Sequence, residues 1–417
     1  MNLKLELSQF FSADWMRRLQ QISKVAADFG LHPYLVGGSV RDILLSRPYN
    51  QDCDVSFTGG NLEPLVRHLF QLMQADLSSK ELKQYKSFGT FTLFFKDGSH
   101  LDLITARKEI YPYPGALPQV QPGTLDDDIL RRDFSVNALF IDLSQQSWGN
   151  LIDDCGGFDD LKNGTLRVIH AKSFEDDPTR LFRLARYTGR LHFKVDPQTE
   201  NWAQQAIQEG ALQTISGHRI STELEKILVE TQAAPILSLL VSWRILSSLN
   251  VSTNLNAPTN WKNCFDKVDH PVLENNLRQR VVVRLVLMLQ NVPESEKFLS
   301  KIHWNLGEAK KVEQILSIAK ALVASEPIVT LKQQNLFPET RLFFQVIAPA
   351  LQSRWQEYVR WMETTPILTG EDLQSLGYSP SPKYKIILEK LAMKKFEGQL
   401  KTKAAEIQFI VDNFSRD

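Results

Sequence analysis

An apolar run that ends in two glycines places the strongest constraint on this chain. Pro33–Val36 predicts a strand that ends at Gly37 and Gly38, and a helical segment over Val40–Leu45 follows. Glycines let the backbone turn so that successive N–H groups point at one spot, which suits a phosphate group. The positive N-terminus of the helix that follows faces the same place. The run therefore predicts a strand, an anion-binding turn and a helix in succession.

Two aspartates lie two residues apart where the next predicted strand, Cys53–Phe57, begins. Side chains two apart on a strand point to the same face, so Asp52 and Asp54 bring two negative charges together. An Mg²⁺ ion that also binds a nucleoside triphosphate is the ion expected between two such carboxylates. Taken singly, a Gly-Gly pair is usually a turn and an Asp-x-Asp pair is usually solvated surface. In this order they predict a metal-dependent nucleotidyltransferase site.

Composition bounds the class of protein. The 417 residues suffice for two to four domains, and 48 basic residues balance 48 acidic ones, which argues against a polynucleotide-coating protein but not against a local basic groove. Cys53, Cys155 and Cys264 lie too far apart for a disulfide framework or zinc site, which fits a reducing cytosol. The N-terminus lacks a signal-peptide pattern, and the apolar run Val281–Leu289 is too short to span a bilayer. We therefore expect a cytoplasmic protein with no membrane partner.

Strand-like runs dominate residues 33–152, and helical periodicity dominates after residue 177. The expected strands are Tyr34–Val36, Cys53–Phe57, Thr90–Phe95, Leu101–Thr105 and Ala138–Leu143, and amphipathic helices are expected over 12–30 and 62–73. The segment 109–123 contains four prolines and two glycines, so we expect an irregular loop, and its position between strands favours a functional one. The predicted fold class is α+β, with a small mixed-sheet head followed by an all-helical remainder.

Further polar residues interrupt this apolar pattern. Asp102 lies within an apolar strand, where it suits deprotonation of an attacking 3′-hydroxyl or completion of a metal shell, or else faces solvent on an edge strand. In the run Arg131–Ala138, Arg132 suits a phosphate, whereas Asp133 and Asn137 suit ribose hydroxyls. An ordinary ion pair that opens a strand is the alternative for this run. Beside a metal site, the nucleotide role is favoured.

The segment that starts at Asp177 predicts a new helix, with an aspartate at its cap and Pro178 at its first position. Asp177, Arg180 and Arg183 are spaced by three and share one face. An aspartate beside an arginine presents an acceptor and fixed donors that match the Watson–Crick edges of cytosine and adenine, but not those of guanine or uracil. The alternative is a helical i,i+3 salt bridge. The spacing thus suits selection of C and A without a nucleic-acid template.

The order of these motifs resembles the bacterial class II tRNA nucleotidyltransferase and poly(A) polymerase family. It runs Gly-Gly-x-Val-Arg-Asp, Asp-x-Asp, Arg-Arg-Asp-Phe-x-x-Asn-Ala, Asp-x-x-Gly-Gly and Asp-Pro-x-Arg. His218–Leu224 and Thr369–Leu373 are similar to later motifs of the family and extend the resemblance over nearly the whole chain. It implies a catalytic nucleotidyltransferase head over 1–150, a base-recognising helical neck over 151–230, and a helical body (231–365) and tail (366–417) that bind tRNA.

The resemblance also implies a reaction, in which CMP and AMP from CTP and ATP are added to the tRNA 3′ end with release of pyrophosphate. Mg²⁺ would be held by Asp52 and Asp54, and segment 109–123 is similar to a flexible loop that helps the switch from C to A addition. Asp133 would contact the ribose, and Asp177 with Arg180 would read the base. The implied catalytic residues are Asp52, Asp54 and Asp102, and the implied nucleotide-binding residues are Gly37, Gly38, Arg41, Arg132, Asp133, Asn137, Asp177, Arg180 and Arg183.

Three other functions remain as alternatives: a partial enzyme that adds only CC or only A, a poly(A) polymerase, and a non-catalytic tRNA-binding protein. The neutral chain lacks the basic extension expected of a poly(A) polymerase, and its intact aspartate pair argues against a retired site. No His-Asp doublet occurs, so a second, phosphohydrolase activity is not expected. Late lysines such as Lys394 and Lys401 suit either the tRNA elbow or a solvated helix face. Oligomeric state and the conformation of 109–123 stay open.

Overall fold

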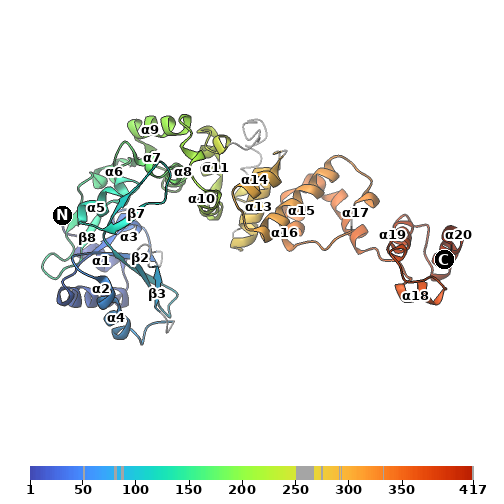
Figure 1. Cartoon of the computed structure of the whole chain (residues 1–417), viewed down its shortest axis with the longest axis horizontal. Coiled ribbons are helices and arrows are strands. Elements are labelled where there is room, and N and C mark those ends of the chain that lie inside the picture. Colours follow the sequence, from blue (N-terminus) through green and yellow to red (C-terminus); the bar gives the residue numbers. More distant parts are fainter. Residues whose placement is uncertain are drawn as a thin grey trace. The chain divides into compact units, whose positions relative to one another are not determined.

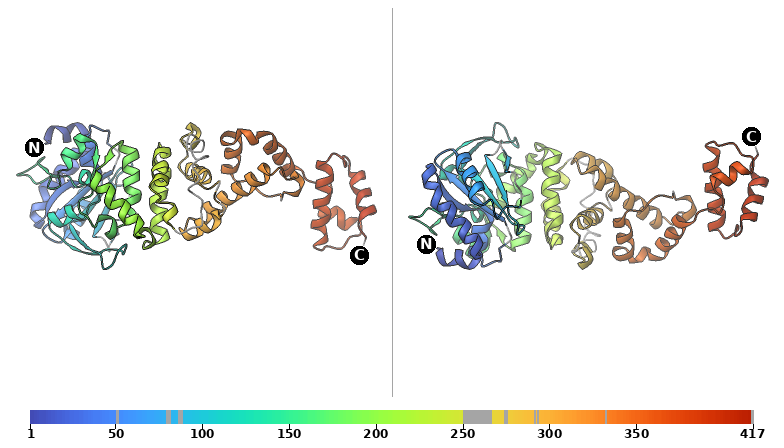
Figure 2. Two further views of the ribbon diagram at one scale, coloured as in Figure 1. Left: turned by 90° about the horizontal axis from the view of Figure 1, so that it is seen from above. Right: turned by 90° about the horizontal axis from the view of Figure 1, so that it is seen from below.

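The computed structural model of the chain describes residues 1–49, 52–78, 82–85, 89–249, 267–273, 276–290, 292, 294–331 and 333–415. The chain divides into two compact units: the first comprises Met1–Phe265 and Ser300–His303, and the second comprises Asp266–Leu299 and Trp304–Asp417. Within the described residues every strand belongs to the first unit (Figures 1 and 2). The predicted α+β class is confirmed, whereas the division into head, neck, body and tail stays a prediction.

The core of the first unit is a seven-stranded mixed sheet with the order β3-β4-β5-β2-β1-β8-β9. The parallel pairing of β2 with β5 sets Asp52 beside His100 and Asp54 beside Asp102, while the other neighbours in the sheet are antiparallel. The strands are β1 (His32–Val36), β2 (Asp52–Thr58), β3 (Lys83–Tyr85), β4 (Thr90–Phe94), β5 (His100–Thr105), β8 (Phe140–Asp142) and β9 (Leu151–Ile152). The predicted strands are thus present, with small shifts at their ends.

Alternation along β1 directs its side chains to two layers. Tyr34 and Val36 pack with Phe140 of β8 and Ile129 of α5 (Leu125–Leu130) on one side. The N-terminal helices pack on the sheet in Figure 1, and α2 contacts β1 while α4 contacts β5. They are α1 (Lys4–Phe10), α2 (Ala13–Ala26) and α4 (Leu62–Leu72), and the glycine turn leads into α3 (Gly38–Leu44). The strong apolar stripes of α2 and α4 therefore cover the sheet as their periodicity predicts.

The expectation of an irregular loop over 109–123 is wrong at both ends of that segment. There β6 (Arg107–Ile110) and β7 (Gln119–Pro122) form a separate two-stranded antiparallel ribbon. Pro122 is tolerated because it pairs with Arg107 at the end of the ribbon, where no further ladder hydrogen bond is required. Only the tip between the two strands is irregular.

The helices after β9 carry the chain away from the sheet. α8 begins at Thr179, one residue later than predicted, and α11 packs against it. The region expected to be all-helical also contains one short parallel pair, β10 (Thr165–Leu166) with β11 (Lys194–Val195). The helices of this part are α6 (Gly157–Asn163), α7 (Ser173–Asp176), α8 (Thr179–Leu191), α9 (Pro197–Gln208), α10 (Gly217–Val229) and α11 (Ala233–Ser242).

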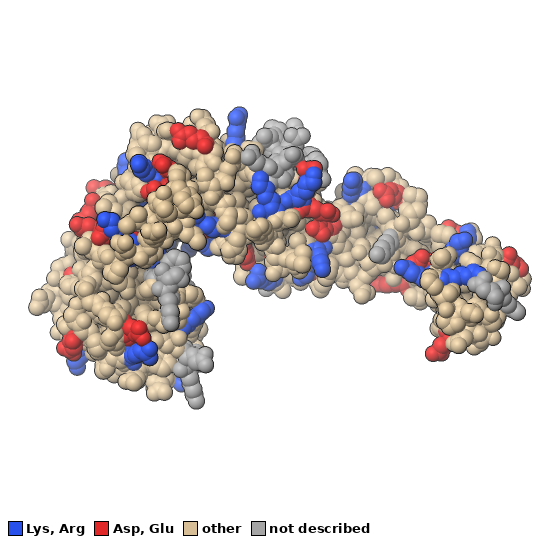
Figure 3. All heavy atoms as spheres, viewed as in Figure 1, with Lys and Arg blue, Asp and Glu red and all other residues tan. Residues whose placement is uncertain are grey.

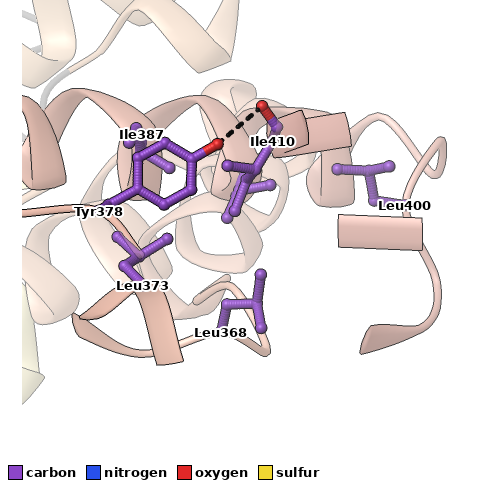
Figure 4. Close-up of a cluster of buried hydrophobic side chains, with 7 residues drawn as sticks. Leu368, Leu373, Tyr378, Ile387, Leu400 and Ile410 are labelled. Carbon is purple, nitrogen blue, oxygen red and sulfur yellow. Dashed lines mark hydrogen bonds between the residues drawn. The ribbon is translucent and has the colours of Figure 1, made fainter. Parts of the chain in front are cut away.

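The second unit is helical throughout its described residues, and its last three helices enclose a small core of their own. Leu373, Tyr378 and Ile410 lie at its centre, where the Tyr378 hydroxyl donates a hydrogen bond to the Ile410 carbonyl at 3.4 Å (Figure 4). No helix in the described part of the chain is both long and apolar enough to cross a membrane. The helices are α13 (Leu277–Leu289), α14 (Ser295–Lys301, whose end belongs to the first unit), α15 (Leu306–Val323), α16 (Pro338–Leu342), α17 (Gln352–Glu363), α18 (Gly370–Ser375), α19 (Lys383–Phe396) and α20 (Lys403–Asn413).

One buried acidic residue fastens this C-terminal core to the segment that enters it. Glu406 of α20 is fully buried, and its carboxyl oxygens accept hydrogen bonds from the backbone N–H groups of Ile367 and Leu368 at 2.8–2.9 Å. A buried N–H without a partner is costly. Glu406 therefore sets where the chain enters the last three helices.

We predict that Glu406→Ala loosens residues 366–415 selectively. The substitution leaves two backbone donors unpaired, at a cost of about 2 kcal/mol or more, which is roughly a thirtyfold increase in local opening. Hydrogen exchange followed by mass spectrometry measures this opening peptide by peptide. Glu406→Gln, which keeps an acceptor, and Gln408→Ala, at an exposed position of the same helix, serve as controls. Unchanged protection of 366–415 in Glu406→Ala would contradict the assignment.

Candidate active site

The glycine turn after β1 adopts a conformation that only glycine takes easily. Gly37 has φ +74° and ψ −138°, and it precedes α3, which starts two residues earlier than the sequence predicts. A Cβ atom on Gly37 would lie 3.2 Å from Asp54 Oδ2 and 3.7 Å from Arg132 Nη1. The absence of a side chain at Gly37 therefore lets this turn approach one carboxylate and one guanidinium closely. A backbone turn packed against these two charges suits a site for a phosphate with its counter-ion.

Three carboxylates belong to the adjacent strands β2 and β5. The half-exposed Asp52 carboxylate lies 3.0 Å from His100 Nε2, while Asp102 accepts a hydrogen bond from the Thr92 hydroxyl at 2.5 Å. Burial raises the pKa of Asp54 to about 7, with the charges of Asp52 and Asp102 adding to the effect and the nearby arginines opposing it. The negative charge of Asp54 is therefore incompletely compensated by the protein itself.

These residues fit a divalent cation. Carboxylate oxygens are the ligands that hard divalent ions prefer, and a cation beside Asp54 would stabilise its ionised form. Asp52 and Asp54 are the pair that the sequence predicts for this role, and the Gly37 turn, which has no side chain, lies against Asp54. Within the described residues no group of three or more His, Cys, Asp or Glu side chains is arranged to hold a metal ion. Asp102 lies in register beside Asp54 on the neighbouring strand, and its role as proton acceptor or metal ligand stays a prediction.

Arg131 and Arg132 are held by an aspartate that the sequence analysis missed. Asp128 of α5 is fully buried and lies 2.7 Å from Arg131 Nη2 and 3.0 Å from Arg132 Nη2. Burial would raise the pKa of Asp128, but Arg132 and Arg131 outweigh it and hold the pKa below its usual value. The spacings of three and four residues between Asp128, on the last turn of α5, and the two arginines that follow this helix were the available signal. This pairing directs Arg132 toward Gly37 and Asp54.

A buried chain of polar side chains connects the glycine turn to α8. Arg41 donates to Asp42 at 3.0 Å and to Asn137 Oδ1 at 2.7 Å, and Asn137 in turn donates to Asp133 Oδ1 at 3.0 Å. Asp133 Oδ2 lies 2.6 Å from Arg183 Nη2. Burial would raise the pKa of Asp133, but Arg183 and the other donors outweigh it, so the pKa stays below its usual value. Four predicted nucleotide-binding residues, Arg41, Asn137, Asp133 and Arg183, are therefore brought together.

The predicted base-reading pair takes a different arrangement from the side-by-side edge expected. Asp177 Oδ1 accepts hydrogen bonds from Thr179 and, at 2.6 Å, from Arg219 Nη2. Arg180 is buried and donates to the Ser173 hydroxyl and the Arg131 carbonyl, both at 2.6 Å. Asp177 and Arg180 thus share the start of α8, while each is satisfied by a different part of the protein.

Arg219 of α10 is the second residue whose role the sequence analysis missed. Its guanidinium donates to Asp177 through Nη2 and to the Gly115 carbonyl at 2.9 Å through Nη1. Gly115 lies at the tip of the β6–β7 ribbon and also donates to the Glu175 carbonyl at 3.0 Å. The only sequence signal was the motif His218–Leu224, which carried no assigned role. Arg219 joins the ribbon tip to the start of α8.

A small mixed sheet that carries paired aspartates beside a glycine turn defines a nucleotidyltransferase head, and comparison with known proteins agrees. Residues 33–167 match the poly A polymerase head domain, and residues 192–250 match the probable RNA and SrmB-binding site of polymerase A. The A-adding tRNA nucleotidyltransferase of Halalkalibacterium halodurans is 30% identical over 96% of this chain and 93% of its own length. That of Geobacter sulfurreducens is also 30% identical over 94% of this chain, but the match spans only 46% of its length.

Solved structures extend this comparison to the fold. A CCA-adding enzyme in an apo form superposes with a TM-score of 0.79, at 26% identity and over 99% of both chains. The Thermotoga maritima CCA-adding enzyme complexed with tRNA gives a TM-score of 0.71 at 25% identity, over 100% of this chain and 99% of that one. The chain therefore belongs to the tRNA nucleotidyltransferase family, as the motifs indicated, and is an enzyme. Membership in this family implies a divalent metal cation as cofactor.

We predict that Asp133→Asn destabilises the folded protein at neutral pH but not in acid. Because the folded state lowers the pKa of Asp133, its ionised form stabilises the fold above the unfolded pKa of about 3.9, and this contribution disappears as the pH falls through the folded value. Loss of the charge leaves Arg183, about a third exposed, without its carboxylate, at about 2–3 kcal/mol.

Urea unfolding at pH 7, 5 and 3.5 measures this difference between Asp133→Asn and the unmodified protein. The difference should be constant from pH 7 to 5 and shrink below about pH 4. Asp159→Asn, whose carboxylate is exposed and lies 3.8 Å from Lys162, is the matched control and should change little. A difference that does not depend on pH would show that the Asp133 charge is not the cause.

Proposed function

We propose that this enzyme adds CMP and AMP to the 3′ end of tRNA, using CTP and ATP and releasing pyrophosphate. The observation that carries the proposal is the close approach of the Gly37 turn to Asp54 and Arg132, backed by the buried chain from Arg41 to Arg183. Relatives support it as well, because solved CCA-adding enzymes of the same fold are complexes with tRNA, ATP and CTP.

The catalytic part of the proposal assigns Mg²⁺ to Asp52 and Asp54. When bound, a divalent ion supplies positive charge that lowers the pKa of the attacking 3′-hydroxyl and stabilises the departing pyrophosphate. In this proposal Asp54 would bind that ion, and Asp102, which pairs in register with Asp54 on the neighbouring strand, is assigned the role of proton acceptor. Gly37, Gly38 and Arg132 supply backbone and guanidinium donors for the triphosphate.

Nucleotide recognition is assigned to two groups of residues near the N-terminus of α8, one for the ribose and one for the base. Asp133 and Asn137 offer an acceptor and a donor for ribose hydroxyls, and Arg41 and Arg183 hold them in place. Asp177 and Arg180 supply the acceptor and donors that match cytosine and adenine. In the arrangement described, a base must compete with Arg219 for Asp177, and Arg180 must turn away from one of its present acceptors.

A specific observation favours a second candidate, an enzyme that adds only the terminal A. The relatives from Halalkalibacterium halodurans, Geobacter sulfurreducens and Aquifex aeolicus are all A-adding tRNA nucleotidyltransferases, at 30%, 30% and 39% identity. The relative from Deinococcus radiodurans is a CC-adding enzyme, 36% identical over 54% of this chain. Complete and partial enzymes therefore share these motifs, and the assay has to separate them.

Incorporation of labelled CTP or ATP into three tRNA transcripts tests the proposal directly. The transcripts lack CCA, end in C, or end in CC, and each is incubated with the enzyme and Mg²⁺. The complete enzyme adds C to the first two and A to the third. ATP addition to the third transcript alone establishes the A-adding alternative, CTP addition alone establishes a CC-adding enzyme, and no incorporation rejects nucleotidyl transfer.

We predict that Asp54→Asn lowers nucleotide incorporation at least about a thousandfold, because it removes the carboxylate charge assigned to the metal. The side chain keeps its shape, so the thermal unfolding midpoint should not fall. Asp76→Asn, at a half-buried aspartate that pairs with Arg17 in the same unit, is the control and should retain activity. Turnover close to that of the unmodified protein in Asp54→Asn would reject the metal assignment.

We predict that Asp177→Ala reduces the preference for CTP and ATP over UTP and GTP by about tenfold or more, since a correct base loses a charged acceptor. Single-turnover incorporation of each nucleotide measures the preference. Asp177→Asn keeps an acceptor for Thr179 and separates loss of charge from loss of the helix cap. Glu209→Ala, at an exposed position on the same unit, should leave the preference intact. An unaltered preference in Asp177→Ala contradicts recognition by this residue.

A further inference from the structure

A cavity of about 540 Å³ lies beyond the proposed nucleotide site, between the second half of α8 and the end of α10. Arg186 and Arg190 of α8 and Lys226 of α10 line it, against one lining carboxylate, that of Glu230. The residues of the proposed catalytic and nucleotide-binding groups do not line this cavity. It therefore has an excess of positive charge and no role in the site described above.

Arg186 is the lining cation that forms no ion pair with a described residue. Its Nε is buried and has no hydrogen-bond partner, and among the described residues its guanidinium forms no ion pair, lying instead 5.2 Å from the centroid of the Tyr187 ring. The other two cations are partly paired, since Arg190 Nη1 lies 3.8 Å from Glu230 and Lys226 Nζ lies 2.7 Å from Glu223. A buried donor without an acceptor is costly, so an anionic ligand would stabilise this arrangement.

The chemistry of these donors suits a phosphate. A guanidinium with free N–H groups binds phosphate oxygens in a fixed, often bidentate geometry, and a second guanidinium and an ammonium add charge. The face of the protein drawn in Figure 3 carries basic and acidic side chains interspersed, so a polyanion on that face must be bound by local sites and not by one broad basic patch.

The position of the cavity along α8 relates it to RNA. Arg183, Arg186 and Arg190 follow one another at helical spacing on the helix that begins beside Asp177 and Arg180. A helix rises about 1.5 Å per residue, so Arg186 lies roughly 9 Å along the axis from Arg180. A stacked strand advances about 3.4 Å per nucleotide, so this is a distance of roughly two to three nucleotides.

We propose that this cavity holds one backbone phosphate of the tRNA acceptor strand, two or three nucleotides from its growing 3′ end, with Arg186 as the principal contact. The proposal rests on the proposed function, because it requires an RNA 3′ end at the start of α8. A phosphate anchored here orients the strand that presents the attacking hydroxyl. A free phosphate or pyrophosphate would accept hydrogen bonds from the same donors, and the experiment distinguishes such a free ion from a phosphate of the tRNA backbone.

Arg186→Ala is the test variant, and the assay uses full-length enzyme with tRNAs ending in CC. We expect the KM for tRNA to rise about tenfold with most of the change in KM and not in kcat, because one charge-assisted contact is lost. Fluorescence anisotropy with labelled tRNA should show a matching loss of affinity and a shallower salt dependence, by about one ion. Lys194→Ala removes an exposed cation that does not line the cavity, and its KM should stay within about twofold.

A tRNA carrying a neutral methylphosphonate at each of its last four linkages in turn identifies the phosphate. One position should weaken binding to the unmodified enzyme about tenfold yet add little to Arg186→Ala, as expected when the two changes remove the same contact. Additive effects at every position would overturn the proposal. So would an unchanged KM and affinity in Arg186→Ala, or altered pyrophosphate inhibition with tRNA affinity preserved, which would assign the cavity to a free phosphate.

Failure of the proposed function can be distinguished from failure of the phosphate-site proposal. If the unmodified enzyme incorporates no nucleotide, the activity assignment fails, and the anisotropy measurements still decide whether Arg186 contacts RNA. Arg186→Lys keeps the charge without the guanidinium fork, so partial recovery of affinity supports the phosphate contact. A thermal unfolding midpoint equal to that of the unmodified protein shows that each variant is folded, and equal tRNA affinity in a folded Arg186→Ala overturns the proposal.

Discussion

The buried polar chain from Arg41 through Asn137 and Asp133 to Arg183 is the constraint on which the arrangement of the site depends. Arg41, Asp133 and Asn137 are each at most 6% exposed, and charge at that depth is costly unless it is paired and hydrogen-bonded. Each member therefore fixes the next: α3 after the glycine turn, the short helical turn that carries Asn137, and the first turns of α8. This chain therefore fixes the position of the glycine turn relative to the start of α8.

Acidic residues of the head fall into two groups, which differ in how far nearby positive charges balance the negative charge of the carboxylate. Asp128 and Asp133 lie against arginines, and the pKa of each is held below its usual value despite burial. Asp54 lies beside two other carboxylates, and burial with these neighbours raises its pKa to about 7. Asp128 and Asp133 hold arginines in place, since their negative charges are balanced by those arginines. The charge of Asp54, which lies against the Gly37 turn, is balanced less fully and is the one available for a cation.

Whether the sequence predicted a given part of this arrangement depends on how far apart in the sequence the contacting residues lie. Period-two apolar runs located the strands, and the two-residue spacing of Asp52 and Asp54 placed both on one strand, because such signals are local. The ribbon β6–β7 was missed since prolines argued against pairing, although an edge position tolerates them. Contacts between distant segments left no local signal: Arg219 reaches Gly115, 104 positions away in the sequence. Side-chain spacing on α8 likewise could not reveal that Ser173 and Arg131 occupy the donors of Arg180.

That distant contact has a consequence for nucleotide choice. Arg219 donates one hydrogen bond to the tip of the β6–β7 ribbon and another to Asp177. Asp177 is also the acceptor that the proposed function assigns to the base. A base that donates a hydrogen bond to the Asp177 carboxylate would compete with Arg219 for it. If the hydrogen bond between Arg219 and Asp177 weakens, the hydrogen bond from Arg219 to the Gly115 carbonyl changes as well. By thermodynamic linkage the effect is reciprocal, so movement of the ribbon tip changes how well Asp177 is presented to a base. In the proposed function, base selection at the start of α8 and the conformation of the proline-rich ribbon are therefore coupled through Arg219.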